Sequence, residues 1–122
     1  ARKIGMKKIY YLSTCDTCKR ILKEIDAPES YALQDIKKDP LTEGELEELK
    51  KLSGSYEKLF SKRARLYKER DLKNKQLSEQ DYKTLLLEHY TFLNRPVIVN
   101  GNEIFIGNSK KTVEAAKNSL HE

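Results

Sequence analysis

The 122-residue chain carries 24 Lys and Arg residues against 19 Asp and Glu residues, a formal net charge of +5. Its length fits one domain with a single core, which should be modest because 35% of the residues are charged. No apolar run approaches the roughly 18 residues that a membrane span needs, and no secretory signal peptide is visible. We therefore expect a cytoplasmic protein with no membrane partner.

The chain opens with a predicted strand, helix and second strand. Residues 1–5 precede Met6, which would serve as a natural start, so we expect them to be a remnant of cloning. The run 8–12 predicts a strand. The next segment predicts a helix, whose apolar positions recur at helical spacing: Cys18, Ile21, Leu22 and Ile25. After a breaker at 26–30, residues 31–36 predict a second strand, which should lie parallel to the first with a right-handed crossover.

The middle of the chain predicts helices. Thr42 and Glu45 have the spacing of a capping box at the start of a helix. Residues 56–88 continue in a helical pattern, with a second capping box at Ser78 and Asp81. We therefore predict that this part of the chain contributes no strand.

A hairpin and a last helix complete the prediction. An Asn-Gly step at residues 100–101 is a strong hairpin signal between the apolar runs 97–99 and 103–106. Asn108 or Ser109 should cap the final helix.

The resulting order is βαβ, a block of helices, and then ββα. This order predicts an α/β protein with a thioredoxin-like fold. We expect a single domain over residues 6–122, with a helical insertion at about residues 41–92.

A Cys-x-x-Cys pair occupies the predicted turn between the first strand and its helix. A cysteine there meets unpaired backbone N–H groups and the positive end of the helix dipole, which both favour the reactive thiolate. Cys15 precedes the helix and should be the more exposed nucleophile, whereas Cys18, one turn later, should be the resolving thiol. The hydroxyls of Thr14 and Thr17 would serve either an oxyanion or the helix end.

Three other roles for the pair compete with redox catalysis. A structural zinc site needs more ligands at close spacing, and the two histidines, His89 and His121, lie far away, so we expect no metal. A structural disulfide would close a very short loop and would be reduced in a cytoplasm. Two inert cysteines on a buried helix face are the third alternative. Redox chemistry is favoured because the motif falls within a βαβ unit.

A basic run marks residues 62–75, in which seven Lys and Arg residues are offset by one Glu and one Asp. The simplest interpretation is a solvated helical face, and the alternative is contact with an anion or nucleic acid. No helix-turn-helix, zinc-finger or aromatic RNA-binding motif accompanies the run, so we expect no direct nucleic-acid binding.

The step from Arg95 to Pro96 stands where thioredoxin-like folds place a cis proline facing the reactive cysteine. Three segments carry a wider likeness: YYLSTCDTCK at 10–19, LNRPVIV at 93–99 and FIGN at 105–108. In these segments the chain resembles the arsenate reductase (ArsC) family, which is glutaredoxin-like and includes the Spx-type redox regulators. The resemblance covers nearly all of residues 6–122.

The resemblance implies roles for individual residues. Cys15 matches the nucleophile that attacks arsenate in glutaredoxin-coupled reductases, and Arg95 matches the arginine that binds the oxyanion. A guanidinium fork suits a tetrahedral oxyanion because it offers paired donors with a permanent charge. Arg63 matches a further arginine, with Arg65 as the alternative, and Pro96 shapes the site. The implied reductants are glutathione, glutaredoxin or thioredoxin, and no bound cofactor is expected.

The leading prediction is therefore an oxidoreductase that reduces arsenate or a related oxyanion or disulfide substrate through Cys15. The alternative is a redox-sensing regulator of the Spx type. The second cysteine favours it, and residues 106–108 supply no arginine where reductases have one. In that role, oxidation of the pair would alter binding to a partner, for which the resemblance suggests the C-terminal domain of the RNA polymerase α subunit.

Overall fold

The computed structural model describes residues 6–121, and its elements fall into two compact units. The first, here called the sheet unit, combines the described residues up to 39 with those from 95 onwards. The second, the helical unit, spans residues 40–94. The helical unit thus interrupts the sheet unit between its second and third strands.

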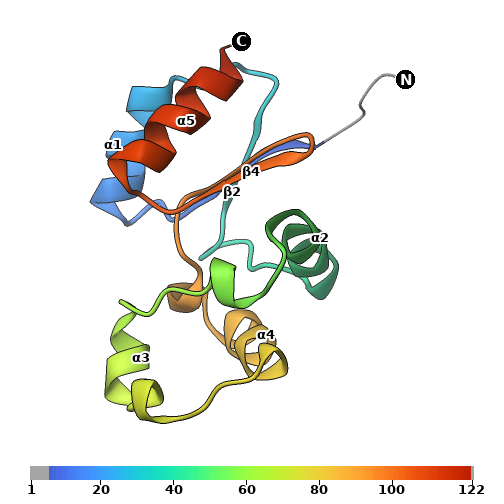
Figure 1. Ribbon diagram of the computed structural model, residues 1–122. Helices are drawn as coiled ribbons and strands as arrows, with labels where there is room; N and C mark the ends of the chain where they lie inside the picture. The colour runs from blue at the N-terminus through green and yellow to red at the C-terminus, as the bar shows by residue number, and fades with distance from the viewer. Residues whose placement is uncertain (1–5, 122) are drawn as a thin grey trace. The chain divides into compact units, whose positions relative to one another are not determined.

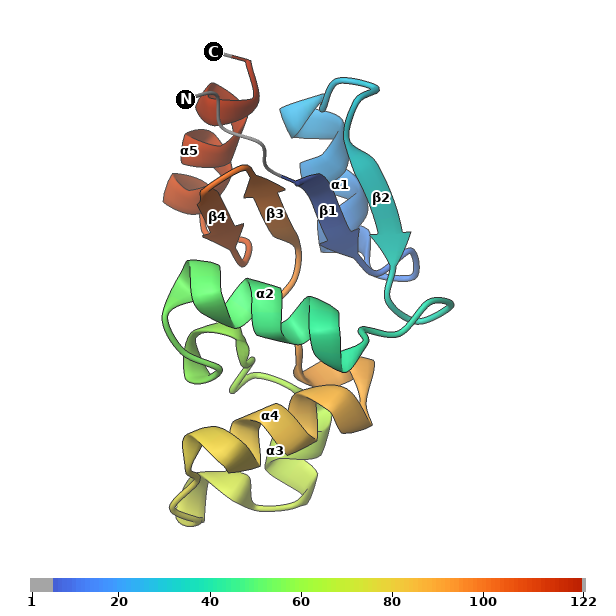
Figure 2. The ribbon, with the colours of Figure 1, turned by 90° about the vertical axis from the view of Figure 1, so that its right-hand side faces the viewer.

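The sheet unit is built on four strands in the order β2-β1-β3-β4 (Figure 2). Their bounds are β1 (Lys7–Tyr11), β2 (Ala32–Asp35), β3 (Val97–Asn100) and β4 (Glu103–Ile106). β1 pairs with β2 in parallel, as predicted, whereas β3 runs antiparallel to both β1 and β4. Because parallel strands end at the same edge, the turn after β1 lies beside the end of β2.

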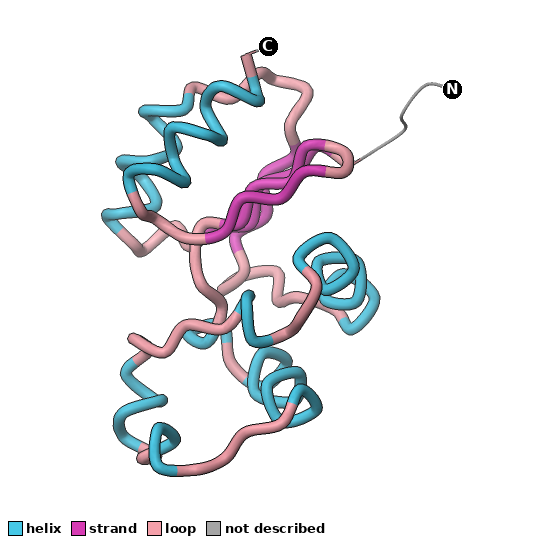
Figure 3. The backbone as a smooth tube through the Cα atoms, in the orientation of Figure 1, coloured by secondary structure: helices cyan, strands magenta, loops and turns pink. Residues whose placement is uncertain are grey.

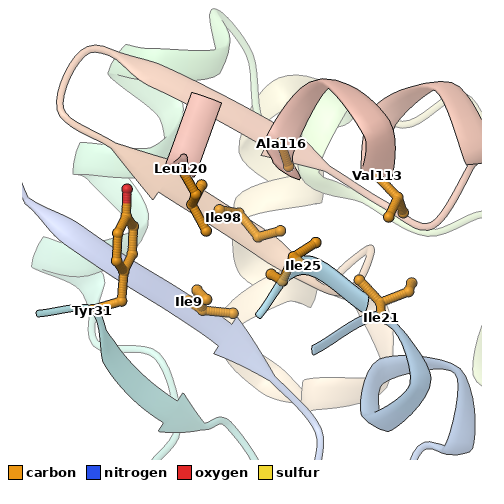
Figure 4. Close-up of a cluster of buried hydrophobic side chains, with 8 residues drawn as sticks. All are labelled: Ile9, Ile21, Ile25, Tyr31, Ile98, Val113, Ala116 and Leu120. Carbon is orange, nitrogen blue, oxygen red and sulfur yellow. The ribbon is translucent and has the colours of Figure 1, made fainter. Parts of the chain in front are cut away.

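Two helices, α1 (Asp16–Ile25) and α5 (Lys110–Leu120), cover one face of this sheet (Figure 1). The core between them is a cluster of eight buried side chains, shown in Figure 4: Ile9, Ile21, Ile25, Tyr31, Ile98, Val113, Ala116 and Leu120. Alternation along β1 directs Tyr10 to the opposite face, where it is also fully buried. The core therefore fixes the C-terminal half of α1 against the sheet, through Ile21 and Ile25.

The hairpin between β3 and β4 forms as predicted, with its turn one residue later than the Asn-Gly step suggested. Asn100 pairs with Glu103, so the central turn residues are Gly101 and Asn102. Gly101 has a φ of 66°, which suits glycine as the first central residue of a type II′ turn. The final helix is capped by Ser109, whose hydroxyl accepts a hydrogen bond from the backbone N–H of Thr112 at 3.1 Å.

The helical unit contains six helical segments: α2 (Glu43–Ser53), η1 (Glu57–Leu59), α3 (Arg65–Glu69), η2 (Leu72–Asn74), α4 (Glu79–Glu88) and η3 (Tyr90–Phe92). Both predicted capping boxes are present, at Thr42 with Glu45 and at Ser78 with Asp81. Among the described residues, no helix is long and apolar enough to span a membrane.

The prediction of a continuous helical pattern over residues 56–88 is wrong in detail, because short helices alternate with loops there (Figure 3). The segment after η1 pairs with another part of the chain: Phe60 bridges Leu93, and the Ser61 N–H donates to the Phe92 carbonyl at 2.8 Å. α3 then ends before Asp71, which adopts a left-handed conformation with a φ of 54°. The helical hydrogen-bond pattern is therefore interrupted by the pairing of residues 60–61 with residues 92–93 and by the left-handed backbone at Asp71.

Candidate active site at the turn after β1

The turn that carries Cys15 is closed by its own backbone. The Cys15 N–H donates to the Leu12 carbonyl at 3.0 Å, and the Cys15 carbonyl accepts from the Lys19 N–H at 3.1 Å. Cys15 is the N-cap residue of α1, in an extended conformation with φ of −98° and ψ of 115°. The cysteine therefore lies at the helix end where unpaired N–H groups and the positive end of the helix dipole converge.

The two thiols differ in exposure as the sequence predicted. Cys15 is half-buried, whereas Cys18 is 0% exposed and lies on the inward face of α1 with Ile21 and Ile25. Both cysteines are free thiols in this structure. An external molecule can therefore reach Cys15 first.

The local electrostatics favour the thiolate form of Cys15. Burial opposes ionisation, but the backbone N–H and the thiol of Cys18 together outweigh it. The positive charge of Arg95 and the backbone N–H of Thr17 act in the same direction. As a result, the pKa of Cys15 lies below its ordinary value, which increases the fraction of nucleophile at neutral pH.

The same contact has the opposite effect on Cys18. The pKa of Cys18 is raised to about 11, mainly by burial, and the charge of an ionised Cys15 and the hydrogen bond to it act in the same direction. The Leu12 backbone and Arg95 oppose the rise. Cys18 thus stays protonated, and its S–H donates a hydrogen bond to the Cys15 sulfur.

Arg95 and Pro96 lie directly before β3 in the chain, and Arg95 lies near the cysteine turn. The peptide bond between them is cis. Arg95 is partly buried and close enough for its charge to stabilise both thiolates. Pro96 is buried, and its carbonyl accepts a hydrogen bond from the Gly107 N–H at 2.9 Å. The structure therefore brings together three of the residues singled out from the sequence: Cys15, Cys18 and Arg95.

Ser13 and Asp35 form a contact beside this turn that the sequence analysis missed. The Ser13 hydroxyl donates to Oδ2 of Asp35 at 2.5 Å, and the Ser13 N–H approaches Oδ1 at 3.4 Å. Asp35 ends β2 and is in register with Tyr11 at the end of β1. Because the strands were predicted to be parallel, a search for polar residues at their shared edge would have found this pair.

The remaining predicted residues are less closely tied to the cysteines. Thr17 is half-buried and contributes its backbone N–H to Cys15, whereas Thr14 is exposed. The roles proposed for their hydroxyls stay predictions. Arg63 and Arg65 belong to the helical unit, and both are exposed. Arg65 forms an exposed ion pair with Glu69 at 3.2 Å, and the roles of both arginines stay predictions.

The basic run is partly neutralised within the helical unit. Besides the pair made by Arg65, Lys62 lies 2.8 Å from Glu57, and Arg70 lies 2.6 Å from Glu88. For the residues that form them, these pairs favour the interpretation of a solvated face. Within residues 6–121, no group of three or more His, Cys, Asp and Glu side chains is placed to hold a metal ion.

The mixed sheet, with α1 and α5 on one face and a cysteine pair after β1, defines a thioredoxin-like fold. The sequence profile of the ArsC family matches residues 10–116, and the chain belongs to that family. No curated protein sequence matches the chain.

Solved structures agree with this assignment. The chain is similar to an ArsC family related protein from Bacteroides fragilis, with 25% identity, a TM-score of 0.72, and coverage of 94% of this chain and 99% of that one. It also resembles an arsenate reductase from Vibrio cholerae, with 22% identity, a TM-score of 0.71 and coverage of 95% and 98%. An arsenate reductase (ArsC) related protein from Brucella melitensis gives 21% identity, a TM-score of 0.68 and coverage of 94% and 97%.

Proposed function

We propose that the chain is a thiol oxidoreductase of the arsenate reductase type, with Cys15 as its nucleophile. The observation that carries the proposal is the placement of Cys15 at the N-cap of α1 near the charge of Arg95, with Cys18 fully buried one turn later. The lowered pKa of Cys15 and the raised pKa of Cys18 agree with this placement. Family membership supports the same reaction class. A cytoplasmic location would keep the pair reduced and ready to react.

The proposed reaction begins with attack of the Cys15 thiolate on the arsenic of arsenate. A sulfur–arsenic bond forms and one oxygen leaves as water after protonation. A second thiol then attacks the Cys15 sulfur, which breaks the sulfur–arsenic bond and releases arsenite. The arsenic gains two electrons, and the two sulfurs lose them as a disulfide forms. Glutathione, glutaredoxin or thioredoxin then reduces that disulfide by thiol exchange.

Two arginines are proposed to bind the oxyanion. Arg95 would stabilise the anionic substrate, since its charge already acts on the Cys15 sulfur. Arg63 would contribute a second guanidinium. Comparing Arg63→Ala with Arg65→Ala tests this choice, because both changes remove one exposed arginine from the same unit. An increase in the KM for arsenate in Arg63→Ala alone is expected, and an equal effect in both variants would refute it.

The deciding experiment measures NADPH consumption with arsenate, glutathione, glutaredoxin and glutathione reductase. A parallel assay uses thioredoxin and its reductase. Sustained turnover that is lost in Cys15→Ser is expected. The matched control is Cys18→Ser, which makes the same chemical change at the buried thiol. If an external thiol resolves the intermediate, Cys18→Ser stays active. If Cys18 resolves it, this variant stops at the sulfur–arsenic intermediate, releases no arsenite and consumes no NADPH.

A second candidate is the redox-sensing regulator, which the contact between the two thiols also favours. In that role, Cys15 and Cys18 form a reversible disulfide that alters affinity for a partner. Absence of turnover together with reversible disulfide formation would replace the enzyme with the sensor. Binding of the RNA polymerase α C-terminal domain would then be compared between the reduced and oxidised protein.

A further inference from the structure

The contact between Ser13 and Asp35 joins two segments that meet only because β1 and β2 are parallel. Asp35 is the last residue of β2, and the next N–H, that of Ile36, donates to the Tyr11 carbonyl at 2.9 Å. The end of β2 is therefore fixed against the end of β1. From this position the Asp35 carboxylate reaches the residue that begins the turn toward Cys15.

The turn from Leu12 to Cys15 is closed by one backbone hydrogen bond, from the Cys15 N–H to the Leu12 carbonyl. Ser13 is the first residue inside this turn, and it is held by its hydroxyl at 2.5 Å. The other Asp35 oxygen accepts from the Lys37 N–H at 3.2 Å, so the carboxylate itself is oriented by the backbone. A carboxylate fixed in this way restricts how the turn can move.

We propose that Asp35 is a positioning residue, whose carboxylate holds Ser13 and, through it, the turn that presents Cys15. The inference rests on the proposed function in one respect, the assignment of Cys15 as the nucleophile. Asp35 is not proposed to contact the Cys15 sulfur. It acts by keeping Cys15 at the start of α1, where the N–H groups of Thr17 and Cys18 face the thiolate.

Two roles for Asp35 predict opposite changes at Cys15. If Asp35 acted only through its charge, removing it would lower the pKa of Cys15, because a nearby anion disfavours a thiolate. If Asp35 holds the turn, removing it loosens the contacts of the sulfur with the helix N–H groups, and the pKa of Cys15 rises. The sign of the change therefore separates the two roles.

The experiment measures the pH dependence of Cys15 alkylation by iodoacetamide in the reduced, full-length chain. Ser13→Ala and Asp35→Ala should each raise the midpoint by about half a pH unit, which is about a threefold slower reaction below the midpoint. The double variant should match the single variants, since both remove one contact. Ser13→Thr, which keeps the hydroxyl, should restore the rate. Glu29→Gln is the control, because it removes an exposed acid elsewhere in the sheet unit.

A lower midpoint in Asp35→Ala would overturn the proposal in favour of a charge effect. An unchanged midpoint with a lower melting temperature would also overturn it, since the contact would then be only structural. If Asp35→Ala fails to fold, Ser13→Ala and Asp35→Asn test the same contact. Alkylation needs no arsenate, so failure of the proposed function would appear in the arsenate assay of the unmodified chain and not here.

Discussion

The hydrogen bond between the two thiols leads to a prediction about Cys18 that does not depend on the substrate. Changing Cys18 to Ala removes the S–H donor but keeps the backbone N–H that also stabilises the Cys15 thiolate. Changing Cys18 to Ser removes the sulfur but keeps a donor. The two variants therefore separate the role of Cys18 as hydrogen-bond donor from its role as resolving thiol.

The magnitude follows from the exposure of Cys15. A hydrogen bond to a charged group contributes about 1.5–3 kcal/mol when well shielded. Cys15 is only half-buried, so we take about 1 kcal/mol for this bond. Since one pKa unit corresponds to about 1.4 kcal/mol, the pKa of Cys15 should rise by about 0.7 unit in Cys18→Ala. In Cys18→Ser the rise should be less than half as large.

The assay is the rate of iodoacetamide alkylation as a function of pH, with mass spectrometry to assign the modified residue. The midpoint of this pH profile gives the pKa of the thiol that reacts. An unchanged midpoint in Cys18→Ala would refute the donor role of the Cys18 thiol. Equal rises in both variants would show that sulfur itself, and not a donated proton, lowers the pKa of Cys15.

Three further predictions use the same protein. Arg95→Ala should raise the midpoint for Cys15 alkylation and abolish protection by arsenate, whereas Arg95→Lys should restore the midpoint but only part of the protection, because lysine lacks the fork. The free energy of unfolding of the reduced protein should fall between about pH 9 and 11 by on the order of 2 kcal/mol, since an unfolded Cys18 ionises at its ordinary pKa of 9.0 and the folded one at about 11. This fall should be smaller by about that amount in Cys18→Ser, in which only the other groups with a raised pKa contribute, and urea unfolding at several pH values measures the difference. Ile98→Ala should cost about 3 kcal/mol in urea unfolding, because Ile98 is 2% exposed in the core shown in Figure 4, and a loss below about 1 kcal/mol would contradict that packing.

Local sequence patterns predicted most of the sheet unit because its elements obey local rules. The spacing of Cys18, Ile21 and Ile25 reflects a helix with one buried face, and all three side chains are buried. In the helical unit, the capping box at Thr42 likewise depends on residues only a few positions apart. Even the hairpin was displaced by only one residue, because Gly101 takes the first central position of the turn.

Interactions between distant segments were harder to predict. The break in the helical pattern after residue 60 arises from pairing with Leu93, which no local window contains. The contact between Ser13 and Asp35 requires the register of β1 against β2, and a shift of one residue would direct Asp35 to the other face of the sheet. For the same reason, the influence of Arg95 on the thiols was inferred from family resemblance and not from spacing.

The interaction between the two thiols also determines the order in which they react. While Cys15 is a thiolate, its charge and its hydrogen bond help keep the proton on Cys18. Once Cys15 is bonded to substrate, both influences are lost, while Arg95 still favours ionisation of Cys18. The resolving thiol is therefore activated by the first step.

In Cys15→Ala the pKa of Cys18 should accordingly fall below about 11, although burial keeps it above its ordinary value. The pH dependence of Cys18 alkylation in that variant measures the fall, and a midpoint that stays at about 11 would mean that burial alone sets this pKa.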